Sequence, residues 1–460
     1  MKKTLALVLT AGFLSLAPSF LSFKSHALIA PPVKFYTIAN AIPNRYIVVL
    51  ATTNLSPIAA PAPTPLTTTQ KTAKTSSASA NTQQQSIDVF EVEGPVPAEP
   101  QVAETAADLT ADYGGTFSLT WSDAVKGFLL NATESQAMAM SQDQRVAFVV
   151  QDGAIAVGTP DADPIVLAPD PSGLIHPPKG TLWGLDRINQ RNLPLDEVYA
   201  NTNTGQGVNA YVIDTGILPT HYEFNQRAFA IYDAVDREGN AIDCNGHGSH
   251  VAGTIGGQTF GVAKQVRLFG VRVLNCQGTG TWSEVIDGVN FVTWHYRRPE
   301  QAGIPAVANM SLGGASNPAA DAAVRNSIRA GVTYVVAAGN GNSDAFAYSP
   351  AGVVEAITVG ATDQLDFRAE FSNYGSTLDL FAPGVSITSA WIGDGNLMFA
   401  TATGTSMASP HVAGVVALYL QNNRSASPAI VRSALVGIST VGLIANPGQE
   451  SPNRLLFTNY

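Results

Sequence analysis

The sequence predicts an α/β protein: a large C-terminal domain, residues 180–460, preceded by a small α+β domain. Residues 208–213, which are apolar except for Asn209, are followed by a carboxylate, Asp214, as expected of a buried parallel strand. A glycine turn at Gly404 is followed by apolar residues at helical spacing between Val412 and Tyr419. Open α/β sheets build their sites in loops at the carboxyl ends of their strands, so Asp214 is a candidate site residue.

The small domain is predicted upstream, in residues 28–158. Its expected strands are 42–50, 124–130 and 145–150, its expected helices are 103–113 and 135–140, and 151–153 is expected to turn away. We interpret this order as the ferredoxin-like β-α-β-β-α-β arrangement. A Pro/Thr/Ser/Gln/Ala tract, 52–86, has no hydrophobic period and is predicted to be a disordered insertion.

The chain begins with features of a secretion signal. Lys2 and Lys3 precede an uncharged stretch, 4–23, and 25–27 is a small-residue cleavage site, so we expect a signal peptide over 1–27. An uncleaved membrane anchor is the alternative, which Pro18 and the small-residue exit disfavour. The prediction is a secreted protein, extracellular or periplasmic, with no membrane attachment after cleavage.

Composition limits the partners. The chain is 45% hydrophobic and only 13% charged, so it can bury a large core. Its formal net charge of −10 argues against a nucleic-acid partner, because phosphates demand a basic face. Residues 159–179 form a proline-rich linker between the two predicted domains.

Ser406 is the strongest candidate nucleophile. It lies in Gly404-Thr-Ser-Met-Ala-Ser-Pro-His-Val-Ala-Gly414, between a glycine turn and the apolar helix. Unsatisfied N–H groups at a helix start could meet an oxyanion that forms beside the serine. The alternative is an ordinary helix cap.

A base and a group to orient it lie upstream of Ser406. His247 stands between two glycines in Gly246-His-Gly-Ser-His-Val-Ala-Gly253, and Asp214 ends the buried strand. Serine needs such partners to act as a nucleophile. The chain order Asp, His, Ser is the order found in subtilisin.

These three segments resemble the Asp, His and Ser signatures of the subtilisin-like serine proteases, most closely the proteinase K and aqualysin branch. The resemblance extends from Trp183 to Tyr460 and includes the segments 183–188, 260–264, 309–314, 336–340 and 371–375. It implies a three-layer fold with a mostly parallel central sheet and a serine endopeptidase (EC 3.4.21), which requires no cofactor for catalysis.

The resemblance also implies a role for each site residue. Ser406 would attack the scissile carbonyl, His247 would transfer the proton and Asp214 would orient His247. Asn340 matches the oxyanion-hole asparagine, whose side chain would act together with the Ser406 N–H. By itself Asn340, in Gly-Asn-Gly, indicates a turn. The other six histidines are expected to have no catalytic role; they are His26, His176, His221, His250, His295 and His411.

Substrate contacts follow from three segments that resemble the family's peptide-binding strands and P1 wall. Their residues are Gly278, Thr279, Gly280, Ser311, Leu312, Gly313, Ala337, Ala338 and Gly339. Glycines let the backbone approach and pair with a peptide. The small uncharged wall favours apolar or aromatic P1 side chains. Ordinary glycine-rich strand ends are the alternative.

The two cysteines, Cys244 and Cys276, are expected to form a disulfide, as in the aqualysin branch. The resemblance further implies a structural calcium ion held by Asp379 and by the carbonyls of Val354 and Ala356. The family has proline where this chain has Val354. A local hydrogen bond is the alternative role for Asp379.

The resemblance further implies a zymogen. Residues 28–158 would be a propeptide that inhibits the enzyme and assists its folding, and the maturation site would lie in 159–179. Protein and peptide substrates and this propeptide are the expected partners of a monomer. A catalytically dead scaffold and an esterase or lipase are the competing classes. The first would have lost one of Asp214, His247, Ser406 or Asn340, and the second would carry Gly-x-Ser-x-Gly.

Overall fold

The computed structural model describes residues 34–51, 93–97, 99–157, 163–237, 239–393 and 395–460. The predicted signal peptide, the predicted disordered insertion 52–86 and His26 lie outside these residues. Within them, no helix has the length and apolar content needed to cross a membrane.

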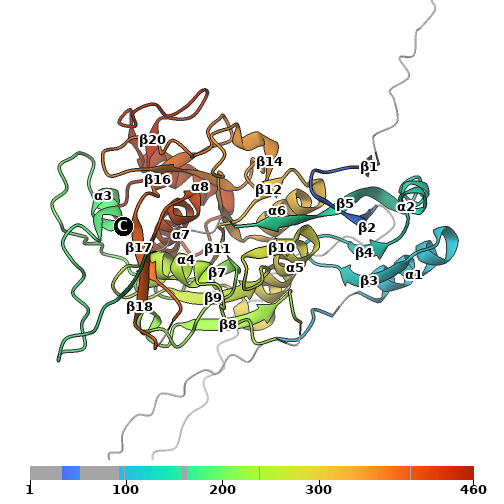
Figure 1. Cartoon of the computed structure of the whole chain (residues 1–460), viewed down its shortest axis with the longest axis horizontal. Coiled ribbons are helices and arrows are strands. Elements are labelled where there is room, and N and C mark those ends of the chain that lie inside the picture. The colour runs from blue at the N-terminus through green and yellow to red at the C-terminus, as the bar shows by residue number, and fades with distance from the viewer. Residues whose placement is uncertain (1–33, 52–92, 98, 158–162, 238, 394) are drawn as a thin grey trace, which may run out of the picture. The chain divides into compact units, whose positions relative to one another are not determined.

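A nine-stranded sheet forms the centre of the C-terminal half (Figure 1). Eight of its nine strands pair in parallel, which confirms the predicted mostly parallel sheet. Seven of the eight follow one another along the sheet. In spatial order these are β16 (Leu380–Pro383), β15 (Ile357–Thr362), β13 (Thr333–Ala337), β11 (Ala306–Met310), β7 (Asn209–Asp214), β9 (Arg267–Arg272) and β8 (Ala228–Asp233). Two short strands, β20 (Arg454–Leu455) and β19 (Thr440–Val441), extend the sheet beyond β16.

Both faces of this sheet are buried. In β7 the alternate residues Tyr211 and Ile213 face one apolar cluster, and Ala210 and Val212 face another. All four are fully buried, which explains why residues 210–213 are all apolar. Helices α5 (Trp282–Arg297) and α6 (Pro318–Ala330) contribute to the first cluster. The second cluster includes residues of α3 (Trp183–Asn189), α4 (His247–Gly256), α7 (Thr405–Asn422) and α8 (Pro428–Ile438).

The remaining strands of this half are short. They are β10 (Thr279–Thr281), β12 (Gly314–Ala315), β14 (Tyr348–Ser349), β17 (Ile387–Ala390) and β18 (Met398–Ala402). Part of the predicted linker also forms a strand, β6 (Asp163–Val166), which pairs antiparallel with β18. Four residues of the predicted linker are therefore paired with the C-terminal half of the protein.

Residues 34–157, termed the N-terminal segment below, contain a second sheet. In the sheet the strands are arranged β1-β5-β2-β4-β3. Along the chain, β2 to β5 and two helices follow one another as β-α-β-β-α-β, the predicted ferredoxin-like order. The elements are β1 (Phe35–Tyr36), β2 (Ala41–Leu50), α1 (Pro100–Tyr113), β3 (Thr116–Trp121), β4 (Gly127–Asn131), α2 (Glu134–Ser141) and β5 (Val146–Ala156).

Sequence reasoning did not locate β3, although Phe117, Leu119 and Trp121 alternate with polar residues as a strand should. The turn predicted at 151–153 is wrong. Strand β5 continues to Ala156 because Gly153 pairs with Ala41 and the residues after it pair with β10.

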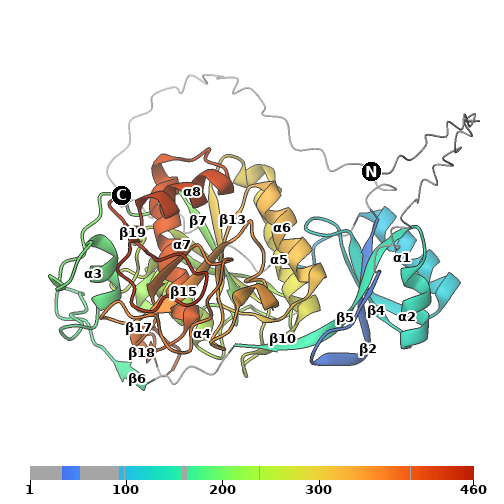
Figure 2. The same cartoon turned by 90° about the horizontal axis from the view of Figure 1, so that it is seen from above.

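One face of the small sheet is covered by α1 and α2, and the other packs on α5 (Figure 2). At this contact the Trp121 indole donates to the Asp287 carboxylate at 2.9 Å. The Asp152 carboxylate accepts the backbone N–H and the hydroxyl of Ser283, at 3.0 and 2.7 Å. Helix α5 therefore belongs to the cores of both sheets.

Candidate active site

Asp214 is the last residue of β7 and is fully buried. Its Oδ1 accepts the Nδ1–H of His247 at 2.7 Å and the backbone N–H of Thr215 at 2.8 Å. A carboxylate that accepts the Nδ1 proton leaves Nε2 as the free basic nitrogen of the imidazole.

His247 is the first residue of α4 and is 1% exposed. The residue before it, Gly246, has a φ of +109°, and a Cβ there would come within 2.5 Å of the Trp391 ring. Only glycine combines this backbone conformation with this close contact. The glycine flanking the histidine in the sequence thus has a steric cause.

Two opposing effects act on the His247 imidazole. Burial alone would lower the pKa of His247, but the Asp214 carboxylate, together with Asp243, raises that pKa above its usual value. A base with a raised pKa accepts the serine proton more readily.

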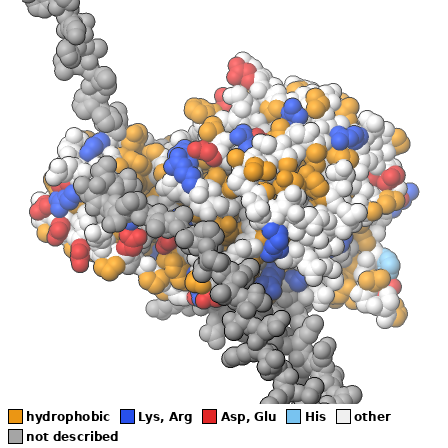
Figure 3. Space-filling model, turned by 180° about the vertical axis from the view of Figure 1, so that it is seen from behind, with side chains coloured by type: hydrophobic (Ala, Val, Ile, Leu, Met, Phe, Trp, Pro, Cys, Tyr) orange, Lys and Arg blue, Asp and Glu red, His pale blue; other side chains and the backbone are white. Residues whose placement is uncertain are grey.

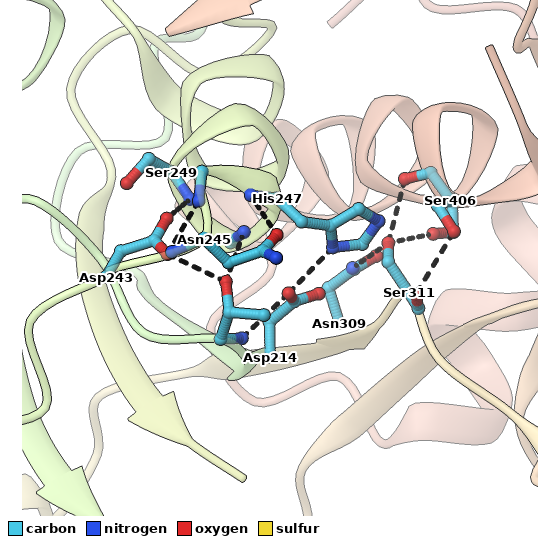
Figure 4. A network of polar contacts seen from close by, with 12 residues as sticks. Asp214, Asp243, Asn245, His247, Ser249, Asn309, Ser311 and Ser406 are labelled. Carbon is cyan, nitrogen blue, oxygen red and sulfur yellow. Dashed lines mark hydrogen bonds and ion pairs between the residues drawn. The ribbon is translucent and has the colours of Figure 1, made fainter. Parts of the chain in front are cut away.

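Ser406 is the second residue of α7 and is partly exposed. The imidazole of His247 lies between Asp214 and Ser406 (Figure 4). In this state the Ser406 hydroxyl donates to the Ser311 carbonyl at 3.1 Å. Bonds between a nucleophile and its base often tighten only when substrate is bound.

Two N–H donors face one space beside Ser406. The side-chain oxygen of Asn340 accepts the backbone N–H and the hydroxyl of Thr405, at 2.9 and 2.8 Å. These bonds fix the orientation of the Asn340 amide. A Cβ on Gly404 would lie 3.3 Å from that nitrogen and 3.7 Å from the Ser406 backbone nitrogen. Both nitrogens therefore lie near one point beside Gly404, as the two donors of an oxyanion hole must.

Two of the three segments predicted to bind substrate line a cavity next to Ser406. The described residues that line it include none of Asp, Glu, Lys or Arg. Residues 311–313 and 337–339 contribute to its wall, together with Ala156 and Val157 of the N-terminal segment. Gly278, Thr279 and Gly280 do not line this cavity; they form the edge against which β5 lies, where the Val157 N–H donates to the Gly278 carbonyl at 2.9 Å.

Sequence reasoning missed the polar groups that support the nucleophile. The Ser311 hydroxyl donates to the Ser406 carbonyl at 2.8 Å and lies 2.9 Å from the Ser409 hydroxyl. Asn309 donates to Ser311 at 2.8 Å. All three supporting residues lie in motifs already quoted, but no sequence signal indicates that their side chains meet.

The other described histidines form hydrogen bonds or ion pairs with protein atoms. Burial lowers the pKa of His250 to about 3, and those of His295 and His411 to about 4. Each bonds protein atoms; His250, for example, donates to the Ile387 and Ala400 carbonyls. His221 bonds the Met398 carbonyl, and His176 pairs at the surface with Asp170.

The predicted disulfide between Cys244 and Cys276 is formed. It joins the turn before His247 to the turn before Gly278. The Asn245 side chain links the same two turns: it donates to the Cys276 carbonyl at 3.1 Å and accepts the His247 N–H at 3.2 Å.

The surroundings of Asp379 do not fit a calcium ion. One of its oxygens accepts Arg432 at 2.6 Å, and the other accepts the Thr358 N–H at 3.0 Å. A guanidinium already neutralises this carboxylate, and Val354 is exposed. Among the described residues, no group of three or more His, Cys, Asp or Glu side chains could hold a metal. The predicted calcium site stays a prediction without geometric support.

A buried aspartate–histidine pair, a serine at a helix N-terminus and two convergent N–H donors define a serine hydrolase built for acyl transfer. Ser406 lies in Gly-Thr-Ser-Met-Ala, not in the Gly-x-Ser-x-Gly elbow of esterases and lipases. The subtilase family profile matches residues 205–452, and the chain belongs to this family. It is a subtilisin-like serine endopeptidase.

Named relatives and a solved structure agree with this assignment. The chain is 49% identical to the extracellular serine proteinase of Thermus sp. (strain Rt41A), over 75% of this chain and 79% of the relative. It is 47% identical to alkaline serine exoprotease A of Vibrio alginolyticus, over 73% of this chain and 59% of the relative. A crystal structure of a cold-adapted subtilisin-like serine proteinase superposes with a TM-score of 0.57. That protein is 50% identical, and the match covers 60% of this chain and 98% of the other.

We predict that Asn340→Ala lowers kcat roughly 10²–10³-fold with little change in KM, because its amide acts mainly on the developing oxyanion. This magnitude is known from a subtilisin. Steady-state kinetics on a peptide substrate measure both constants. Asn342→Gly, in the same loop as Asn340, is the matched control. The Asn342 side chain accepts a hydrogen bond from Arg368, and its positive φ is one that glycine tolerates. If Asn340→Ala and Asn342→Gly had equal kcat values, Asn340 would have no role beyond forming the turn.

A second prediction concerns the disulfide. The Cys244→Ser/Cys276→Ser double variant should lose roughly 3–4 kcal/mol of stability in the chain-entropy model, since the bridge spans 32 residues. The stability of the parent and the variant is compared through the half-life of activity during heating, with and without reductant. Reductant should shorten the half-life of the parent enzyme but not that of the variant. Labelling of two free thiols in the unreduced parent would contradict the prediction.

Proposed function

We propose that this chain is made as a secreted zymogen whose Asp214, His247 and Ser406 hydrolyse peptide bonds through an acyl-enzyme. The proposal depends on one observation. His247, bonded to Asp214 at 2.7 Å, lies next to Ser406 at the start of a helix. The Ser406 and Asn340 nitrogens lie near one point beside that serine.

The residues divide the reaction as follows. The Ser406 hydroxyl attacks the scissile carbonyl while His247 Nε2 takes its proton. Negative charge then develops on the carbonyl oxygen, which the Asn340 and Ser406 N–H groups stabilise. His247 returns the proton to the leaving amine, and water later releases the acyl group by the same route. Asp214 keeps its charge and stabilises the imidazolium.

The cavity beside Ser406 supports a preference for apolar or aromatic P1 side chains. Its described lining carries no charged group that would pair with a basic or acidic P1 residue. A buried apolar surface favours side chains that lose little on leaving water. Backbone pairing along β10 adds affinity without selecting for sequence, which suits broad specificity.

The N-terminal segment has the contacts of an inhibitory propeptide. Ala154–Ala156 pairs antiparallel with Thr279–Thr281, and Val157 lines the cavity that holds Ser406. It therefore occupies the cleft as a substrate strand would. The match to the Thermus relative covers 75% of this chain, or about 345 of 460 residues, whereas residues 180–460 number 281. The match to that relative therefore includes part of the chain upstream of residue 180.

Secretion, a monomeric state and protein substrates complete the proposal. Two relatives are named as an extracellular proteinase and an exoprotease. Acidic and basic side chains are interspersed on the face drawn in Figure 3, a charge distribution that does not favour nucleic acid. Maturation in residues 159–179 remains part of the proposal, as does the absence of any catalytic cofactor.

We predict that Ser406→Ala abolishes casein hydrolysis and leaves the precursor at full length, because the same serine would cleave both casein and the precursor. Electrophoresis and N-terminal sequencing of protein secreted from a protease-free host measure processing. Ser425→Ala, an exposed serine beyond the end of α7, is the control and should mature normally. Normal maturation of pure Ser406→Ala would exclude self-cleavage, and retained caseinolysis would exclude the assigned nucleophile.

We also predict that residues 28–158, added in trans, inhibit the mature enzyme and speed recovery of a denatured catalytic domain. A parallel sheet has many non-local contacts and folds slowly, so a partner surface can assist it. Asp152→Ala should weaken inhibition by about 10–100-fold, the loss expected for a charged hydrogen-bonding group at an interface. Asp108→Ala, on the exposed face of α1, is the control. Inhibition constants from progress curves measure these effects. If the wild-type residues 28–158 did not inhibit at micromolar concentration, the proposed inhibitory role would be refuted.

A further inference from the structure

A second buried carboxylate, Asp243, lies beside the His247 turn, on the side away from Ser406 (Figure 4). It is 4% exposed and precedes His247 by four residues. Its Oδ1 accepts the backbone N–H groups of Asn245 and Gly246, each at 2.9 Å. Its Oδ2 accepts the backbone N–H of Ser249 at 2.8 Å. One side chain therefore holds both sides of the turn that carries His247.

Asp243 also connects this turn to the end of β7. The Thr215 hydroxyl donates to Asp243 Oδ1 at 2.9 Å and accepts the Gly248 N–H at 2.9 Å. The Thr215 backbone N–H in turn donates to Asp214 at 2.8 Å. A continuous path of hydrogen bonds thus runs from Asp243 through Thr215 to Asp214, separate from the bond between Asp214 and His247.

The arrangement of donors determines what Asp243 can do. Three of its four partners are backbone N–H groups, and the Thr215 hydroxyl has its proton free for the carboxylate because its oxygen already accepts from Gly248. Ser249 and Gly248 belong to the first turn of α4, whose N–H groups have no partners within the helix. A carboxylate at that position fixes the helix start and interacts favourably with its dipole.

We propose that Asp243 is a positioning residue of the proteolytic reaction, holding the His247 turn against the turn that carries Asp214. It does not touch the substrate and acts only through these two turns. The inference rests on the proposed roles of Asp214 and His247. A displacement of about 1 Å between reacting groups can cost on the order of 100-fold in rate, so a support of this kind affects kcat rather than KM.

The charge of Asp243 adds a distinguishing effect. The groups that act electrostatically on His247 are Asp214, Asp243 and the neighbouring His250. Both carboxylates favour the imidazolium, whereas burial lowers the pKa of His250 to about 3 and leaves it neutral above that pH. Burial also raises the pKa of Asp243, and the hydrogen bonds that this carboxylate accepts oppose that rise. Activity needs neutral His247, so kcat/KM falls as pH decreases through the pKa of His247. Removing the Asp243 charge lowers that pKa and moves the acid limb of the profile to lower pH.

The test compares Asp243→Asn, Thr215→Val and Thr215→Ser in the full-length chain, matured and quantified by active-site titration with a serine-reactive phosphonate. Asp243→Asn should lower kcat at least tenfold with little change in KM and shift the acid limb downward. Thr215→Val, which breaks the path but keeps the charge, should lower kcat without that shift. Thr215→Ser keeps the hydroxyl and should retain more activity than Thr215→Val. The Thr215 pair also tests the proposal if Asp243→Asn does not fold.

Asp366→Asn is the matched control, because Asp366 is also a buried carboxylate but bonds Arg187, away from the site. It should change stability and leave both kcat per active site and the acid limb unchanged. The proposal is overturned if Asp243→Asn behaves like Asp366→Asn, or if Thr215→Val matches Thr215→Ser. His247→Ala separates this failure from a failure of the proposed function, because substantial activity in that variant would refute the triad itself.

Discussion

The burial of the central parallel sheet on both faces is the constraint from which the site follows. Each fully buried aliphatic side chain contributes roughly 1.5–3 kcal/mol, so strands such as β7 have no solvated face on which a polar residue could lie. The charged residues of this sheet are confined to the strand ends. Asp214 therefore lies at the last position of β7, at the edge where α4 begins.

The same physical device recurs at two helix starts. Asp243 accepts N–H groups in the first turn of α4, and Asp152 accepts the Ser283 N–H at the start of α5. In each case a buried carboxylate satisfies donors that the helix leaves unpaired and interacts with the positive end of the dipole. At α4 this device supports the histidine turn. At α5 it joins the N-terminal segment to the rest of the protein.

The peptide-binding edge illustrates how backbone and side chains share the work. Strand β10 offers its backbone to β5, while the neighbouring cavity is lined by small uncharged residues such as Ala338 and Gly339. Affinity for an extended chain then comes from main-chain hydrogen bonds, which any peptide provides. This division of roles is what allows one edge to receive both the N-terminal segment and, in the proposed function, a substrate.

The sequence by itself determined the strand that ends in Asp214, the chemistry of the Asp214, His247 and Ser406 motifs, the pairing of the only two cysteines and the family. These depend on local signals: apolar runs, glycine turns and residue types within short motifs. The same local signals located four elements of the N-terminal segment within a few residues. They failed at β5, where Asp152 and Gly153 suggest a turn but pairing with β2 and β10 keeps the chain extended.

Only the tertiary structure decided which polar side chains meet. Asp243 and Thr215 are 28 residues apart in the chain, Asn340 and Thr405 are 65 apart, and Asp379 and Arg432 are 53 apart. No periodicity or motif relates such pairs, because their contact depends on how the sheet brings its loops together. For the same reason the resemblance could suggest calcium at Asp379, whereas the fold places a guanidinium there. Local sequence specifies the elements and the chemistry of each motif, and long-range packing specifies the partners.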